Sequence, residues 1–265
     1  MFNISSKRIS LHLFLINAFI YISFSQYVPY LGPYFSKAGI NAVEIGILLT
    51  VGPVSSILIQ PLWAVISDRT GRRRDVLSVA VLGCAISIFS YYIGHTFLSF
   101  FIASILISFF STSIVPMSDA LMLRSANKNN LDFSKIRMGG TIGYAIFVII
   151  SGMIVKKNSN LAYIMGFTGF MILLGLVRCL PKDEPQETRP VQKNPEKSSV
   201  KSNGSLLHIF ESKQIYFLLA FAFISQVGLS FTYSFLSVYM LKLGFSASTM
   251  GITNSIAAIS ELPVL

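Results

Sequence analysis

Residues 61–74 read PLWAVISDRTGRRR, and they join the end of one long apolar run to the start of another. The apolar runs on either side, at about 43–66 and 76–94, are close to 20 residues long. An α-helix of roughly that length crosses a ~30 Å hydrocarbon core. Between them, Asp68 and a cluster of arginines occupy a few residues. Two membrane-length runs separated by a short basic turn predict two membrane helices that are joined on one side of a bilayer.

The rest of the chain alternates in the same way. It is 53% hydrophobic and only 12% charged, with a mean hydropathy of +0.66. Soluble domains carry about 25% charged residues, so this chain has too little charge to cover a soluble surface. The apolar runs are continuous, and backbone groups in lipid must bond within the protein, so helices are favoured over a barrel. We predict an all-α polytopic membrane protein with apolar segments at about 9–35, 43–66, 76–94, 96–122, 138–155, 160–179, 215–240 and 246–265.

The basic residues are distributed unevenly between the two sides of this predicted topology. If the N-terminus is cytoplasmic, seventeen of the 21 Lys and Arg residues lie on the cytoplasmic side. The four on the other side are Lys37, Lys156, Lys157 and Lys242. The positive-inside rule therefore predicts a multi-pass protein of the inner (plasma) membrane with its N-terminus inside. The net charge of +10 is explained by this topology, so the bilayer is the expected partner and nucleic acid is not.

One segment interrupts the series of apolar runs. Residues 181–213 are rich in Pro, Lys, Glu and Ser, which is the composition of a solvated linker. We therefore predict three parts, namely a six-helix bundle over 1–180, a cytoplasmic linker over 181–213, and the start of a second bundle over 214–265.

An internal repeat supports this division. A shift of 205 residues lays YLGPYFSKAGINAVEIGI, from Tyr30, over FLSVYMLKLGFSASTMGI, from Phe235. The identical pairs are Leu31/Leu236, Tyr34/Tyr239, Lys37/Lys242, Gly39/Gly244, Ala42/Ala247, Gly46/Gly251 and Ile47/Ile252. Apolar composition does not explain the Lys, Tyr and Gly identities. Parallel repeats of this kind are typical of transporters whose halves are related by an axis along the membrane normal.

The same shift bears on the extent of the protein. It maps Leu265 onto Gln60, which lies inside the second apolar segment. Extrapolation of the repeat predicts four more helices and an end at roughly residue 390 for a complete protein. The 265-residue chain by itself is expected to lack half of a transport cavity, and therefore not to transport.

The turn at 61–74 resembles the cytoplasmic loop motif of the major facilitator superfamily, G-x-x-x-D-R-x-G-R-R. The matching residues are Asp68, Arg69, Gly71, Arg72 and Arg73, while Ala64 stands where Gly is usual. The resemblance implies a secondary transporter of two six-helix bundles, a monomer when complete, that works by alternating access. It also implies that Asp68 and Arg72 belong to a charge network that latches the bundles in the outward-facing state. Gly71 is expected to permit the tight reversal, and Arg73 and Arg74 are interpreted as topology anchors.

Two further stretches are similar to the phenylpropionate-permease-like branch, which is related to nucleoside–proton symporters and to lactose permease. PMSDALMLRSANKNNLDFSKIRMGGTIGY, at 116–144, carries the branch's D-A-L at Asp119 and its R-x-x-G-[ST]-I-G-[FY] from Arg137. IAAISELPVL, at 256–265, carries Glu261 and then a proline, as the branch does. The resemblance implies proton-coupled uptake of an aromatic acid, a nucleoside or a saccharide. It favours a gating role for Asp119, paired with Arg72 or with Arg137.

Other functions are weighed against uptake. The fifth segment, GGTIGYAIFVIISG, lacks the proline of the G-x-x-x-G-P-x-x-G-G pattern that is usual in drug–proton antiporters. Uptake is therefore favoured over drug or metabolite export, and a truncated scaffold that does not transport is the other alternative. His12, His95 and His208 are scattered, and neither a metal-ligand spacing nor a phosphate-binding loop occurs. We expect no enzyme, no cofactor and no metal.

Ionisable and polar groups inside the bilayer are the candidate site residues, because placing such a group in the membrane costs free energy and therefore suggests a role. Glu261 is the candidate for proton coupling, with a purely structural carboxyl as the alternative. The first segment carries Asn17, Tyr21 and Ser25 at i, i+4 and i+8, and the seventh carries Gln226, Ser230 and Tyr233 on one face. The repeat places Tyr21 over Gln226 and Ser25 over Ser230. The pattern leaves open whether these faces line a solute cavity or join helices.

Overall fold

The computed structural model describes residues 6–180 and 213–260, and every element within these ranges is a helix. Most of the predicted linker, and Glu261, lie outside the described residues. The elements are α1 Ser6–Ser25, η1 Val28–Tyr30, α2 Leu31–Lys37, α3 Ala42–Thr70, α4 Arg73–Ser87, α5 Ser90–Ile93, α6 Phe97–Ser111, α7 Ile114–Lys128, α8 Phe133–Lys157, α9 Leu161–Arg178, α10 Lys213–Lys242 and α11 Ala247–Ser260.

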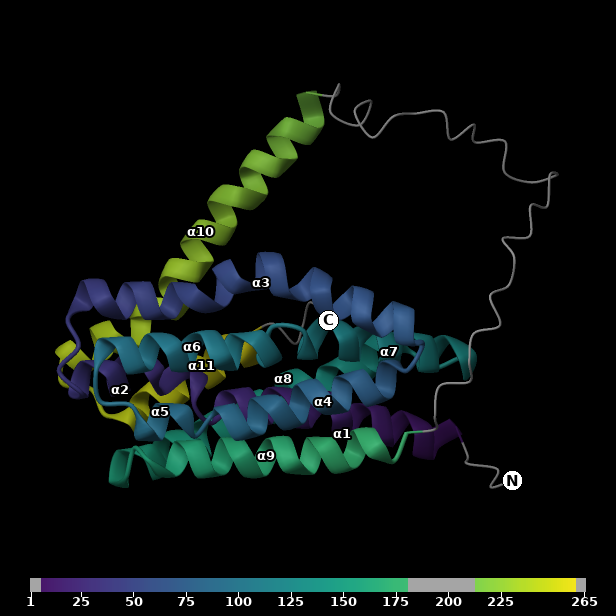
Figure 1. Ribbon diagram of the computed structural model, residues 1–265, viewed down its shortest axis with the longest axis horizontal. Coiled ribbons are helices and arrows are strands. Elements are labelled where there is room, and N and C mark those ends of the chain that lie inside the picture. Colours follow the sequence, from purple (N-terminus) through teal and green to yellow (C-terminus); the bar gives the residue numbers. More distant parts are fainter. Residues whose placement is uncertain (1–5, 181–212, 261–265) are drawn as a thin grey trace.

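The predicted membrane spans are confirmed to within a few residues. Among the described residues, seven stretches are long and apolar enough to cross a membrane: Lys7–Lys37, Ala42–Thr70, Arg73–Ile93, Phe97–Lys128, Phe133–Lys157, Leu161–Arg178 and Ile215–Lys242. The eighth apolar segment corresponds to α11. In Figure 1 the spans of the first half run roughly parallel and side by side.

Three of the described spans are interrupted along their length. The first changes to a 3-10 turn at η1, which contains Pro29, and the fourth breaks at Thr112–Ser113, shortly before Pro116. Kinks are expected at both prolines, because proline removes a backbone donor. The third span also breaks, at 88–89, where the sequence has no proline. Hydroxyl groups of serines beside this break donate to backbone carbonyls, which is an interaction that competes with regular helix.

Glycines allow α8 to pack closely against α1. A Cβ atom built on Gly139 would lie 2.6 Å from the carbonyl oxygen of Phe14, and one built on Gly143 would lie 3.0 Å from that of Ala18. Real Cβ atoms do not approach a backbone oxygen as closely as the first of these distances. Small residues let membrane helices approach in this way, so α1 and α8 form the tightest interface of the six-span bundle.

The internal repeat is confirmed in the backbone. Gly39 and Gly244, which the shift of 205 pairs, both adopt the left-handed region at φ +83°. The hydrogen bonds around them also correspond one to one: Ala38 to Tyr34 and Leu243 to Tyr239, Gly39 to Ser36 and Gly244 to Leu241, Ile40 to Phe35 and Phe245 to Met240, Ile45 to Asn41 and Met250 to Ser246. The turn between the first two spans therefore recurs between α10 and α11.

The two helices of the second repeat contact the first six spans near one end. The last part of α10 packs against α2 and η1, and α11 packs along α8. Every residue of α10 from Tyr216 to Thr232 is exposed. Figure 1 shows α10 leaving the end of the bundle and rising steeply away from the other spans. The second-repeat helices are thus joined to the bundle at the end that carries the 38–41 and 243–246 turns, and α10 diverges from it toward the opposite end.

Candidate functional site

The contact between α8 and α11 is a seam with no space for side chains at its centre. A Cβ atom on Gly152 would lie 2.6 Å from the carbonyl oxygen of Ala247, and one on Gly251 would lie 2.6 Å from that of Val148. The hydroxyl group of Tyr30 reaches the same place from η1 and donates to Val148 O at 2.7 Å. It lies 2.9 and 3.0 Å from the two would-be Cβ positions. We call these five residues the seam.

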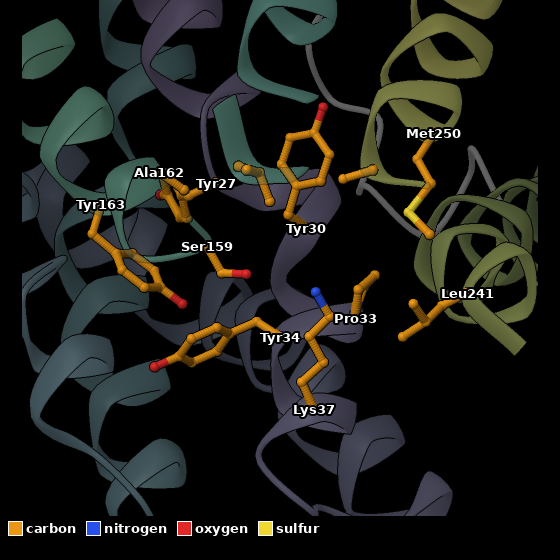
Figure 2. Close-up of a pocket in the computed structure, with 12 residues that line it drawn as sticks. Tyr27, Tyr30, Pro33, Tyr34, Lys37, Ser159, Ala162, Tyr163, Leu241 and Met250 are labelled. Carbon is orange, nitrogen blue, oxygen red and sulfur yellow. The ribbon is translucent and has the colours of Figure 1, made fainter. Parts of the chain in front are cut away.

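Beside the seam lies a small cavity of about 30 Å³, which offers room for about one water molecule. Figure 2 shows tyrosines from the first span and from α9 around it, with Leu241 and Met250 of the second repeat on one side. The rings of Tyr34 and Tyr163 pack edge to face with centroids 5.2 Å apart. Such aromatic pairs contribute beyond their buried area. No solute of the size of a sugar fits in this cavity, because the described helices pack closely around it.

A larger hollow, of about 360 Å³, opens where α10 diverges from α3. Its walls come from Ala42 and Ile45 on one side and from residues of α10 on the other: Phe231, Thr232, Phe235, Leu236, Val238, Tyr239 and Lys242. Volumes of this size hold small ligands in other proteins. The lining is mostly apolar, however, so the hollow offers few groups that could orient a polar solute.

The candidate polar face of α1 lies inside the bundle. Asn17 is 1% exposed and Ser25 is fully buried, while Tyr21 is half-buried. Asn17 and Tyr21 lie against Gly140 of α8. The Ser25 hydroxyl donates to Ile22 O at 2.8 Å. The Oδ1 atom of Asn17 is buried and accepts no hydrogen bond within the described ranges, which leaves one acceptor available on this face.

The corresponding face of α10 has a different environment. Gln226 and Ser230 are exposed, and the side chain of Tyr233 lies outside the described residues. The repeat pairs these positions with Tyr21 and Ser25, yet α8 packs over the α1 face while the α10 face remains open. The structure thus brings Asn17 and Tyr21 together, and it does not bring the α1 and α10 faces together.

The loop motif forms a tight reversal at the opposite end of the molecule from the seam. Gly71 ends α3 in the left-handed conformation, at φ +64°, as expected from its place in the motif. Asp68 pairs with Arg73 at 2.9 Å, through side chains that are 67% and 31% exposed. Exposed pairs of this kind contribute at most about 1 kcal/mol. Arg69 and Arg72 are exposed, and Arg72 forms no salt bridge with any residue that the structure describes.

Arg74, interpreted from the sequence as a topology anchor, also makes structural contacts inside the protein. Its side chain is only 11% exposed, because α4 carries it under the end of α9. There its guanidinium donates to the carbonyl oxygen of Leu180 at 2.8 Å. Asp75 contacts Arg74 at 3.3 Å and Arg178 at 3.4 Å. A cation at a helix C-terminus satisfies carbonyls that lack helical partners, so Arg74 and Asp75 fix the end of α9 against α4.

Asp119 is half-buried on α7. The positive charge of Arg137, near the start of α8, acts on its carboxylate, although the two side chains form no direct salt bridge in the described structure. Of the two partners expected for Asp119, the arrangement therefore places Arg137 within electrostatic reach.

Sequence reasoning missed most of the residues that build the seam. Gly152 and Val148 carry no polar group that would mark them, and Gly251 stands out in the sequence only as a repeat match. The sequence signal that could have identified them is a small residue on each of two membrane helices, Gly152 and Gly251, because small residues allow such helices to pack closely. Their partnership becomes visible only when the helices are placed in space.

Comparisons with known proteins agree on one family. The model of the MFS_1 like family matches residues 8–265. Among curated proteins, the uncharacterized transporter YwbF of Bacillus subtilis is 24% identical over 93% of this chain and 60% of its own length. The probable 3-phenylpropionic acid transporter of Escherichia coli is 24% identical over 91% of this chain and 62% of its own length. The chain thus spans about 60% of the length of these two relatives.

A maltose permease of Geobacillus stearothermophilus is 24% identical over 58% of this chain and 39% of its own length. Among solved structures, a mutant form of the nucleoside transporter NupG superimposes with a TM-score of 0.77 at 18% identity, over 97% of this chain and 66% of that one. At this level of identity the structural likeness shows a shared fold.

Proposed function

The chain belongs to the MFS_1-like family of the major facilitator superfamily, a family of non-enzymatic membrane transporters, and we propose that it acts in the movement of a small organic solute by alternating access. The observation that carries this proposal is the asymmetry of the second-repeat helices. They are closed onto the first six spans at the seam, and α10 is exposed along 216–232 toward the other end.

In the proposed mechanism, two bundles rock about a site near the middle of the membrane. The first bundle is formed by 1–180, and α10 and α11 begin the second. In the conformation with a closed seam, the opposite end gives access to the solute. Rocking would separate α11 from α8 at the seam and bring α10 toward α3. The glycine backbones at the seam permit close contact without interlocking side chains, so that the contact can form and separate.

The loop motif lies at the end that would close in the alternate state. We propose that Asp68, Arg69, Arg72, Asp119 and Arg137 form the latch of that state, with Gly71 shaping the turn that carries the arginines. The exposure of Arg69 and Arg72 supports this role, because their charges are available to a partner.

An Asp119→Asn variant is expected to transport the solute more slowly, with no change in the dependence of transport on protons.

For the solute, we propose an aromatic acid, a nucleoside or a saccharide taken up with protons. The relatives support the saccharide and aromatic-acid classes, since they include a maltose permease and a probable 3-phenylpropionic acid transporter. Asn17, Tyr21, Ser25, Gln226, Ser230 and Tyr233 are the proposed solute-facing residues. The unpaired Oδ1 of Asn17 supports a polar partner there. Glu261 is the proposed proton carrier.

The test is uptake by membrane vesicles from cells that produce a form of the protein with both bundles. Radiolabelled maltose, 3-phenylpropionate and uridine are offered with and without an inward proton gradient. We expect one of them to accumulate above the level in vesicles without the protein, and a protonophore to abolish the accumulation. The Glu261→Gln variant should lose the gradient dependence and keep exchange of solute. Gradient-driven export of all three solutes, or equal accumulation by both kinds of vesicle, would contradict the proposal.

We also propose that the N-terminus and the loop motif face the cytoplasm, on the basis of the seventeen-to-four distribution of basic residues. Cys179 is exposed at the end of α9, on the same side as the loop motif, and Cys84 is buried. A membrane-impermeant maleimide is therefore expected to label the protein in permeabilised cells and not in intact cells, and Cys179→Ser should remove the label. Labelling of Cys179 in intact cells would place this end of α9 outside the cell and contradict the proposed topology.

A further inference from the structure

The fourth span is broken between α6 and α7, and the break leaves backbone carbonyls without helical partners. In a continuous helix the carbonyl of Thr112 would accept a hydrogen bond from residue 116. Residue 116 is proline, which has no N–H group. The carbonyl of Phe109 would accept from Ser113, which lies in the break itself. Unpaired carbonyls are costly at membrane depth, so both need another donor.

Side chains of α3 supply the missing donors. The amide Nε2 of Gln60 donates to Thr112 O at 2.9 Å, and the indole Nε1 of Trp63 donates to Phe109 O at 2.7 Å. The two donors are three residues apart and therefore lie on one face of α3. The spacing of the donors on α3 thus matches the spacing of the two unpaired carbonyls.

The position of Gln60 is unusual for a polar side chain. It is exposed on a span that is otherwise apolar along this stretch, with Ile57, Leu58 and Leu62 among its exposed neighbours. A glutamine in this setting is expensive unless it is paired. Trp63, by contrast, is buried and packs against Phe109 and Phe110 at the end of α6. One donor therefore comes from the rim of the interface and the other from its interior.

We propose that Gln60 and Trp63 are positioning residues that hold the bend of the fourth span, with Gln60 standing in for the N–H group that Pro116 lacks. The bend sets the direction of α7, and α7 carries Asp119 three residues after Pro116. The interface between α3 and the break thus determines where the Asp119 carboxylate lies relative to Arg137. This role does not depend on which solute is moved, or on whether the chain transports.

A double-mutant cycle between Gln60 and Pro116 tests the inference. Gln60→Met removes the donor and keeps the length of the side chain. In the otherwise unchanged protein it is expected to lower the midpoint of thermal unfolding in detergent by roughly 2–4 °C. In a Pro116→Ala background the restored N–H group can satisfy Thr112 O. The same Gln60→Met change should then lower the midpoint by less than about 1 °C.

A matched control is available on α3. The hydroxyl of Thr50 donates to Gly46 O within the same helix and does not reach the fourth span. Thr50→Val should therefore shift the midpoint equally with Pro116 present and in the Pro116→Ala background. If Gln60→Met lowers the midpoint of thermal unfolding equally in both backgrounds, or changes it in neither, Gln60 does not substitute for the missing donor. The inference is then overturned.

A distance measurement separates positioning from simple stabilisation. Spin labels are attached to Leu106→Cys on α6 and Leu123→Cys on α7, two exposed positions on either side of the break, in a Cys179→Ser background. Gln60→Met is expected to broaden the distribution of label-to-label distances while Pro116 is present. In the Pro116→Ala background the distribution should be insensitive to residue 60. An unchanged distribution in Gln60→Met with Pro116 present would show that the bend is held by other contacts, and would overturn the positioning role.

Discussion

Replacement of Gly139 by leucine is expected to abolish recovery of the folded protein. The Cβ of any side chain at this position would lie 2.6 Å from the carbonyl oxygen of Phe14. That oxygen belongs to the backbone of α1 and cannot rotate aside, so α1 and α8 would have to separate. Overpacking of a core ordinarily costs about 1–3 kcal/mol. We expect about 3 kcal/mol or more here, because the collision involves two helix backbones at the tightest interface of the bundle.

The measurement is the fraction of protein that elutes as a single symmetric peak from size-exclusion chromatography in mild detergent, together with the midpoint of thermal unfolding. Gly175→Leu on α9 is the matched control, because a Cβ there meets nothing within 4 Å. Leucine has a higher helix propensity than glycine by almost 1 kcal/mol, so the control should be neutral or slightly more stable. Equal behaviour of the two variants would show that α1 and α8 are not packed as described.

Gly251→Leu is expected to open the seam while leaving the six-span bundle folded. A Cβ at this position would lie 2.6 Å from Val148 O and 3.0 Å from the hydroxyl of Tyr30, so α11 must move away from α8. The reporter is Met250, which is 1% exposed beside the seam. In a Met250→Cys, Cys179→Ser background, the rate of reaction with a maleimide should rise roughly 10- to 100-fold. A destabilisation of about 1–3 kcal/mol corresponds to that range.

Gly228→Leu on α10 provides the control, since a Cβ at this position has no neighbour within 4 Å, and its labelling rate should remain that of the parent. In the uptake assay, Gly251→Leu should also reduce transport at least tenfold, because the end that carries the seam could no longer close. Slow labelling of Met250→Cys in the Gly251→Leu variant would mean that the seam tolerates a side chain, and would remove the basis for its role as a gate.

The membrane spans and the turn at Gly71 could be predicted from the sequence because both depend on local properties. A run of apolar residues specifies a spanning helix whatever surrounds it, and a glycine beside a helix end specifies a left-handed cap. The repeat could also be predicted from the sequence, since Gly39 and Gly244 need the same backbone conformation in both copies. The break in the third span at 88–89 could not be predicted, because no proline marks it.

The candidate site depends on contacts between residues that are far apart in the sequence, and no single segment of sequence predicts such contacts. Gly139 and Gly175 both lie within membrane helices, and only their neighbours in space distinguish them: a Cβ at Gly139 would meet the backbone of α1, whereas one at Gly175 would meet nothing within 4 Å. Arg73 and Arg74 are adjacent and chemically identical, yet one is paired at the surface and the other is buried under the end of α9. The face of Asn17 could be identified from the sequence, but its contact with Gly140 became visible only from the position of α8.

The exposure of α10 has a consequence for how the protein is made. From Tyr216 to Thr232 this helix buries no residue against the other described helices, so packing against them cannot help to draw it into the bilayer. Its own apolar side chains must supply the free energy of insertion, as they do for an independent segment that leaves the translocon laterally. We therefore expect α10, fused alone to a reporter, to integrate into microsomal membranes as efficiently as it does within the chain. Assembly against α2 and η1 would then be a later event that takes place within the lipid.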